Sequence, residues 1–158
     1  MSQEWIVGIG DMKYASGEDR IVTFALGSCV GVTFYDPILH LGALLHVLLP
    51  ESMEQPEKAV FRFADTGVRE TMRQLKPLGF AKERAVVKIA GGARMFEDFS
   101  QFGGIGERNV ASVRAALARE GLRISKEDVG GKTARTMTLF LKNGDVTVHS
   151  AGFPVKHL

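Results

Sequence analysis

The sequence predicts an α/β fold, a layered sandwich in which helices flank a mixed or antiparallel sheet. Segments rich in β-branched and aromatic residues outnumber segments with helical spacing by roughly six or seven to two. The Asn143-Gly144 pair separates two alternating runs, which is a strong hairpin signal and argues against a purely parallel sheet. The chain has 158 residues without a linker, repeat or low-complexity tract, so we expect one domain over residues 1–158.

The first half of the chain is expected to supply the buried strands. They are predicted over residues 4–9, 21–35 and 40–49. The second run contains Gly27 and Gly31, which favour bulges, and the third is almost continuously apolar, which indicates burial on both faces. Asp36-Pro37 starts a turn between them. A polar loop over 51–57 then leads to a helix over 58–76.

The second half alternates strands with one helix and one long loop. Strands are predicted over residues 84–90, 122–127, 135–141 and 145–149. The helix covers 107–120, with Gly121 just past its end. The loop over 93–106 has glycine pairs near both ends, and its apolar residues either line a site or fold back into the core. These apolar residues are Met95, Phe96, Phe99 and Phe102.

Composition excludes several classes of function. Twenty basic and eighteen acidic residues leave a net charge of +2, so we expect no binding to nucleic acid or to an anionic membrane. No run approaches the ~20 apolar residues that span a bilayer, and the start lacks a signal peptide, which predicts a cytoplasmic protein. The 130–133 run (GGKT) lacks the first glycine of a phosphate-binding loop, and no metal-ligand spacing is present. We therefore expect no cofactor and no metal.

The single cysteine, Cys29, is a candidate nucleophile because His46 is expected beside it. If residues 36–39 form a four-residue hairpin loop, Tyr35 lies opposite His40 and Cys29 lies opposite His46. Directly opposed side chains are close enough for a thiol–imidazole hydrogen bond, although a one-residue bulge would change the register. An adjacent imidazole lowers the pKa of a thiol and later protonates a leaving group.

Neighbouring residues complete this candidate site. Thr23 lies six positions before Cys29, on the same face of a regular strand, and its hydroxyl or carbonyl can hold the second ring nitrogen of His46. Gly27 allows a sharp turn, and backbone amides from Gly27 to Cys29, above all those of Ser28 or Cys29, can donate to an oxyanion. Each residue also has a plain structural explanation, because an apolar strand commonly buries an inert cysteine, a histidine or a threonine. The combination in one hairpin favours catalysis.

These residues resemble the chemoreceptor glutamine deamidase family, CheD. The resemblance is carried by residues 23–30 (TFALGSCV), 35–37 (YDP), 42–46 (GALLH) and 49–50 (LP), and further by 8–10 (GIG), 64–65 (AD), 91–96 (GGARMF), 105–110 (IGERNV) and 127–131 (EDVGG). It covers nearly the whole chain. It implies a cysteine hydrolase that converts receptor glutamines to glutamates, with Cys29, His46 and Thr23 as the catalytic residues. It also implies a fold similar to the catalytic domain of cytotoxic necrotising factor toxins.

The resemblance further implies the partners of the protein, which are the helical bundle of a chemoreceptor's cytoplasmic part and, in many bacteria, the phosphatase CheC. A glutamyl methyl ester would give the same thioester, so esterase activity is chemically accessible. We expect Arg94, Phe96 and Phe102 to contact substrate. The main alternative is a regulatory binding module for CheC or the receptor with an incidental thiol; a redox sensor and a peptidase are further alternatives.

Overall fold

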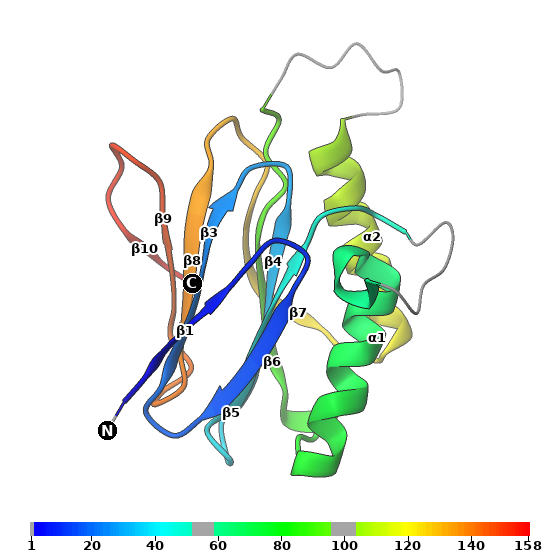
Figure 1. The fold of residues 1–158 in the computed structure, drawn as a ribbon, viewed down its shortest axis with the longest axis vertical. Coiled ribbons are helices and arrows are strands. Elements are labelled where there is room, and N and C mark those ends of the chain that lie inside the picture. The colour runs from blue at the N-terminus through cyan, green and yellow to red at the C-terminus, as the bar shows by residue number, and fades with distance from the viewer. Residues whose placement is uncertain (1, 52–58, 96–103) are drawn as a thin grey trace.

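The protein is a three-layer structure in which one sheet lies between a second sheet and two helices (Figure 1). The computed structural model describes residues 2–51, 59–95 and 104–158. Within these ranges the outer sheet has the order β1-β3-β8-β9-β10 and the central sheet the order β2-β5-β4-β6-β7. Each sheet contains one parallel pair, β1 with β3 and β6 with β7, among antiparallel pairs. The predicted layered α/β class is thus confirmed, while the similarity to the toxin domain stays a prediction.

The elements have the following bounds. The outer sheet is formed by β1 (Glu4–Val7), β3 (Arg20–Leu26), β8 (Arg135–Phe140), β9 (Val146–His149) and β10 (Lys156–His157). The central sheet is formed by β2 (Met12–Ser16), β5 (Leu41–Val47), β4 (Val30–Asp36), β6 (Val86–Gly91) and β7 (Ile124–Val129). The helices are α1 (Ala64–Leu75) and α2 (Ile105–Arg119), with 3₁₀ turns η1 (Val60–Arg62), η2 (Lys76–Leu78) and η3 (Lys82–Arg84).

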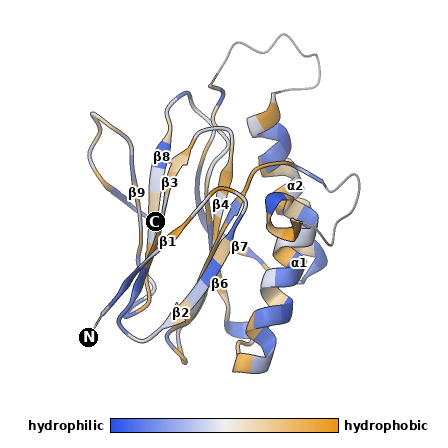
Figure 2. Ribbon diagram, viewed as in Figure 1, coloured by the Kyte–Doolittle hydropathy of each residue, from blue (hydrophilic) through white to orange (hydrophobic). Residues whose placement is uncertain are grey.

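Two apolar cores fill the spaces between the three layers. One packs the helices against the central sheet, and the other packs the two sheets together. Every residue of β4 and β5 is buried because both faces of these strands are covered, as the apolar run over 40–49 indicated. Phe34 points to the helical side and Tyr35 to the outer sheet. Each helix carries hydrophobic and hydrophilic residues, as expected for a helix covering one face of a sheet (Figure 2).

The predicted strand over 21–35 is wrong in one respect, because it is two strands in different sheets. β3 belongs to the outer sheet and β4 to the central sheet. The β3–β8 ladder is irregular between Thr23 and Leu26, and Ala25 there has a φ of 59°. Residues 27–29 then carry the chain across to the central sheet. Composition reports strand propensity but does not show which sheet a strand joins.

The predicted register of the β4–β5 hairpin is also wrong, by two residues. Asp36 lies opposite Leu41, and Gly31 lies opposite His46. The loop therefore covers 37–40, because the Asp36 carboxylate accepts hydrogen bonds from the amides of Ile38 and Leu39 while its backbone stays in the ladder. A displacement of two residues keeps every side chain on its original face.

Other predicted elements are largely confirmed. The β8–β9 hairpin turns at Asn143-Gly144, where Gly144 has a φ of 79°. The first helix starts later than predicted, at Ala64 after η1, and the second starts at Ile105. The short edge strands β2 and β10 were not predicted. The polar loop predicted over 51–57 lies almost entirely outside the described residues.

Candidate active site

Three buried residues lie near the point where the chain passes from β3 of the outer sheet to β4 of the central sheet. Thr23 comes from β3, His46 from β5, and Cys29 from the crossing segment. Thr23 and His46 are completely buried, and Cys29 is 6% exposed. Cys29 packs in the core between the two sheets, as does Leu44, which shares a face of β5 with His46. Thr23 shares the inner face of β3 with Ile21, so it reaches the same layer.

Thr23 holds the imidazole of His46 in one tautomer. The Thr23 hydroxyl donates to the carbonyl of Val7 at 2.8 Å, across the β1–β3 pair. The same oxygen lies 2.7 Å from Nδ1 of His46. A hydroxyl has one proton, and that proton is given to Val7, so Oγ1 must accept from Nδ1–H. The predicted hydrogen bond between Thr23 and His46 is confirmed, and it leaves Nε2 as the unprotonated nitrogen.

The Nε2 atom of His46 is a buried acceptor with no hydrogen-bond partner in the described parts of the chain. Burial lowers the pKa of His46 to about 4, so the ring is neutral at neutral pH. A neutral imidazole with a free Nε2 lone pair is the state that a general base requires.

Cys29 is a diagonal neighbour of His46 on the same face of the central sheet. Gly31 lies directly opposite His46, and Cys29 precedes Gly31 by two residues. Diagonal side chains on one face start roughly 7–8 Å apart at the backbone, which a long or aromatic side chain still spans. Direct opposition of Cys29 and His46 is therefore corrected to a diagonal relation, and no hydrogen bond joins their side chains.

The thiol also differs from the sequence-based expectation in its acidity. Burial raises the pKa of Cys29, and a hydrogen bond from its own backbone amide only partly opposes this. The resting site therefore holds a neutral thiol and a neutral imidazole. Such a pair acts only when the imidazole removes the thiol proton as the nucleophile attacks.

The crossing segment is held from one side by the end of β6. Amides of Gly92 and Ala93 donate to the carbonyls of Cys29 and Gly27, each at 2.8 Å. Gly91 has a φ of 113°, and a β-carbon there would lie 2.2 Å from the Cys29 carbonyl oxygen. Only glycine permits this close approach of the two backbone segments.

The sharp turn before Cys29 is made by a residue that was not predicted. Ala25, with its left-handed φ, turns the chain, whereas Gly27 does not adopt a positive φ. The Gly27 amide donates to the Ala25 carbonyl at 3.0 Å, so it is already engaged. The Gly27 amide is therefore not free to bind an oxyanion, and the role of the Ser28 and Cys29 amides as oxyanion donors stays a prediction.

The substrate-contacting residues are only partly described by the structure. Phe96 and Phe102 lie outside the described residues. Arg94 is exposed, forms an ion pair with Glu107 at the start of α2, and donates its backbone amide to the Gly131 carbonyl. Its role in substrate contact stays a prediction.

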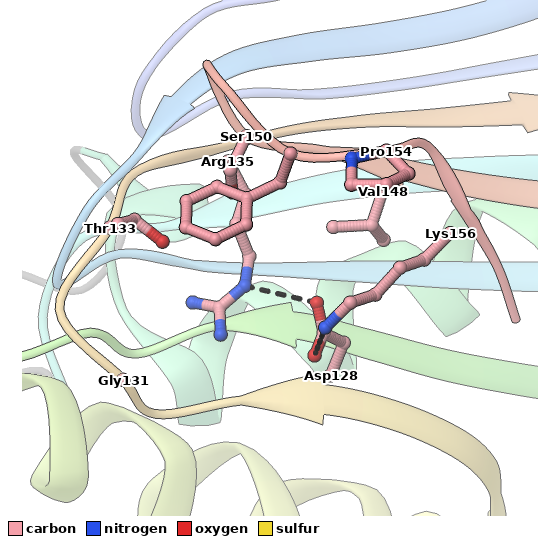
Figure 3. Close-up of a pocket in the computed structure, with 9 residues that line it drawn as sticks. Asp128, Gly131, Thr133, Arg135, Val148, Ser150, Pro154 and Lys156 are labelled. Carbon is pink, nitrogen blue, oxygen red and sulfur yellow. Dashed lines mark hydrogen bonds and ion pairs between the residues drawn. The ribbon is translucent and has the colours of Figure 1, made fainter.

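A polar cluster beside the site fastens the ends of β6 and β7 (Figure 3). The buried guanidinium of Arg135 donates to the Asp128 carboxylate at 3.2 Å and to the carbonyls of Gly91 and Gly130 at 3.3 and 2.8 Å. Lys156 also reaches Asp128, at 3.3 Å. The cluster therefore supports the backbone that contacts Cys29. Asp128 and Gly130 lie in the 127–131 segment of the resemblance, but the sequence predicted no role for them or for Arg135 and Lys156.

Asn109 of α2 is a second polar residue that was missed, although it lies within the quoted 105–110 motif. It is fully buried, and its Nδ2 donates to the carbonyls of Ser28 and Leu48 at 2.9 and 3.1 Å. Its Oδ1 has no hydrogen-bond partner among the described residues. A lone polar residue on the buried face of a predicted helix was the available signal.

The described residues contain no group of three or more potential metal ligands, and none of their helices is long and apolar enough to cross a membrane.

A family model described as CheD chemotactic sensory transduction matches residues 48–150. The chain belongs to the CheD family.

CheD relatives match beyond the residues of that model. A Desulforamulus reducens protein is 41% identical, with 95% of this chain and 92% of the relative covered. A Symbiobacterium thermophilum protein is 42% identical, with 92% of each covered. A Geobacter metallireducens protein is 41% identical over the full length of both. Each of these CheD proteins is named a probable chemoreceptor glutamine deamidase.

Proposed function

We propose that this CheD protein deamidates glutamine side chains of chemoreceptors through a thioester on Cys29. The names of its relatives support the reaction and the substrate class. The observation that carries the proposal is the buried chain from the Val7 carbonyl through Thr23 to Nδ1 of His46, because it leaves Nε2 free to take a proton. Cys29 is the nucleophile next to that base, and Thr23 orients it.

The first half-reaction acylates the cysteine. Nε2 of His46 removes the thiol proton while Sγ of Cys29 bonds to the carboxamide carbon of the glutamine. The amides of Ser28 and Cys29 donate to the oxyanion that forms on the former carbonyl oxygen. The imidazolium then gives its proton to the departing nitrogen, the C–N bond breaks, and ammonia leaves.

The second half-reaction hydrolyses the thioester. Nε2 of neutral His46 takes a proton from water as the water oxygen bonds to the acyl carbon. The C–S bond breaks, the proton returns to sulfur, and glutamate is released. Thr23 accepts from Nδ1–H in both charge states of the ring, so it keeps Nε2 directed at the reacting atoms throughout.

A diagonal rather than direct relation between Cys29 and His46 fits a site that closes around substrate. Catalytic hydrogen bonds are often long in free enzymes and shorten in the substrate complex. A rotation of the Cys29 thiol would then bring Sγ towards Nε2, which Thr23 holds in place, when the carboxamide arrives.

The finer expectations follow from the same chemistry. A glutamyl methyl ester would form the same thioester with loss of methanol, so methylesterase activity is included in the proposal. The expected partner is the helical bundle of the receptor's cytoplasmic part, with CheC as a second partner that regulates access. We place this reaction in the cytoplasm, where those receptor segments lie.

Intact-mass measurement of a receptor cytoplasmic fragment tests the proposal. The wild-type protein should convert defined glutamines to glutamates, which peptide mapping locates, and acid quenching should trap an acyl group on Cys29. Cys29→Ala and His46→Ala should leave the fragment unchanged. Because Cys29 is the sole cysteine of the chain, wild-type protein blocked by iodoacetamide is a matched control that retains every other side chain.

Full activity in Cys29→Ala, His46→Ala or the blocked protein would reject the thioester mechanism. An inactive wild-type protein that nevertheless binds the receptor or CheC equally well with and without Cys29 would favour the regulatory binding module instead.

A further inference from the structure

β4 and β5 separate at the end of the hairpin where Cys29 and His46 lie. Val30 and Val47 form the last pair of the ladder. If the register continued, Leu49 would lie opposite Ser28, and its amide would donate to the Ser28 carbonyl. The Leu49 amide instead donates to the carbonyl of Arg62 in η1, at 2.8 Å.

Asn109 replaces the missing ladder bond. Its Nδ2 has two protons, and it reaches the carbonyl of Ser28 from one strand end and the carbonyl of Leu48 from the other. A side chain of α2 thus bridges the two diverging strands at the point where they separate. Ser28 precedes Cys29 by one residue, and Leu48 follows His46 by two.

We infer that Asn109 is a positioning residue that sets the distance between the Cys29 thiol and the His46 imidazole. This inference rests on the proposed function for its importance in catalysis, but its geometry does not depend on the substrate. Only a neutral side chain with two donors on one atom satisfies both carbonyls without bringing a charge into the buried site. The Oδ1 atom, by contrast, has no partner in the described ranges, so the contacts of this residue are concentrated on its donors.

Loss of the bridge should affect the reaction more than the fold. The two strand ends would no longer be joined, and the diagonal separation of Sγ and Nε2 would vary. Misplacement of reacting groups by about 1 Å costs about 10²-fold in rate. We therefore expect Asn109→Ser, which keeps one donor, to lower kcat by about tenfold, and Asn109→Asp, which keeps the shape but loses both N–H donors, to lower it by about 10²-fold.

A double-mutant cycle on thiol reactivity tests the inference without a substrate. The rate of Cys29 alkylation by iodoacetamide is measured against pH for the wild type, Asn109→Ser, His46→Ala and the double variant. Asn109→Ser should slow alkylation about tenfold in the wild type and less than about twofold in the His46→Ala background, because it acts through the thiol–imidazole relation. Equal effects in both backgrounds, or none, would overturn the inference.

Val113→Ala is the matched control for damage to the helix. Val113 is fully buried one turn further along the same helix and packs on the central sheet, and its side chain has no group that could hydrogen-bond to either strand end. It should lower the unfolding temperature but leave kcat and the alkylation profile unchanged, and a comparable loss of kcat would count against Asn109. If Asn109→Asp does not fold, the inference is tested with Asn109→Ser alone, by its kcat and its alkylation rate. Failure of the wild type to deamidate would reject the proposed function while the alkylation cycle still decides the role of Asn109.

Discussion

The two ends of the β4–β5 hairpin both bury polar side chains, but they complete the hydrogen bonds of those side chains differently. At the turn end, the fully buried Asp36 carboxylate accepts from Arg84 at 2.7 Å, from the Ala81 amide at 3.3 Å and from two loop amides. Burial would raise the pKa of Asp36, but these donors outweigh it and the pKa is lowered. Tyr35 likewise donates to the Leu141 carbonyl at 2.8 Å.

At the other end, two acceptors lack partners. Nε2 of His46 and Oδ1 of Asn109 are the buried side-chain atoms without a hydrogen bond among the described residues. Buried polar atoms are normally paired, because an unpaired one costs about 1–3 kcal/mol. Completed hydrogen bonds make the turn end a stabilising feature, whereas an open acceptor beside a thiol is available to take a proton. Substitutions at the two ends should therefore change different properties.

The largest effect is expected for the activity of His46→Gln. Loss of the general base should lower kcat/KM for receptor deamidation by about 10²–10⁴-fold. The free energy of unfolding at pH 7 should fall by only about 1 kcal/mol, because the hydrogen bond from Nδ1 to Thr23 is lost whereas Nε2 had no partner to lose. Urea denaturation and mass-based rates measure both quantities. His149→Gln, on the exposed side of β9, is the control and should retain activity, and an active His46→Gln would remove the distinction between the two ends.

The next effect is the dependence of stability on pH. The unfolded chain binds a proton at His46 below pH 6.5, but the folded chain does so only below about 4, because burial lowers this pKa. Stability from this group is thus present above pH 6.5 and decreases as pH falls to about 4, by about 3 kcal/mol at most. The contribution of His46 is measured as the difference in unfolding free energy between the wild type and His46→Gln, followed against pH. A difference that does not change between pH 7 and pH 4.5 would show that His46 is not buried as a neutral ring.

The contribution of Asp36 to the stability of the protein should be lost in a lower pH range than that of His46. Its lowered pKa means that its contribution is present above its ordinary value of 3.8 and is lost as pH falls through the folded-state pKa. Asp36→Asn should destabilise the protein by about 2 kcal/mol at pH 7, because hydrogen bonds to a charged acceptor are lost. At a temperature well below unfolding, kcat should remain that of the wild type.

Glu83→Gln is the matched control for Asp36. It removes an exposed carboxylate beside Arg84, and its effect should stay within about 0.5 kcal/mol. If Asp36→Asn lowered kcat at constant stability, the turn end would also take part in the reaction.

The sequence predicted correctly which face of the sheet carries the site, but it predicted the wrong register between β4 and β5. The register was wrong by two residues, and the side-chain period of a strand is also two, so Cys29 and His46 remained on one face. Thr23 reaches that face from the other sheet, across the space between the layers. Its hydrogen bond to His46 was predicted correctly although the single strand assumed for it does not exist.

Contacts between distant segments could not be predicted, because local patterns do not encode them. Asn109 contacts Ser28 across 81 positions of sequence, and the pattern of α2 showed only that one polar residue lies on its buried side. The left-handed Ala25 is similarly invisible, since alanine is not a residue typical of that conformation. Asn143-Gly144 was predictable because the turn type selects the residues themselves.

The smallest effects are expected for glycine substitutions at Ala25 and His40. Both are non-glycine residues with a left-handed backbone, Ala25 before Cys29 and His40 in the β4–β5 turn. Their φ angles are 59° and 49°. Ala25 is exposed, so Ala25→Gly loses no packing. The substitution relieves a left-handed conformation that costs an L-residue about 1–2 kcal/mol. Glycine in turn favours the unfolded chain by about 0.5–1 kcal/mol, which opposes this gain. We expect a net stabilisation of about 0.5 kcal/mol by urea denaturation. His40→Gly relieves a similar φ but loses the contact between Nδ1 and the Tyr35 hydroxyl at 3.1 Å, so it should be the less stable variant. The opposite order would mean that the left-handed turn before Cys29 is stabilised by contacts of the Ala25 methyl group, and that the site end is more fully packed than its open acceptors indicate.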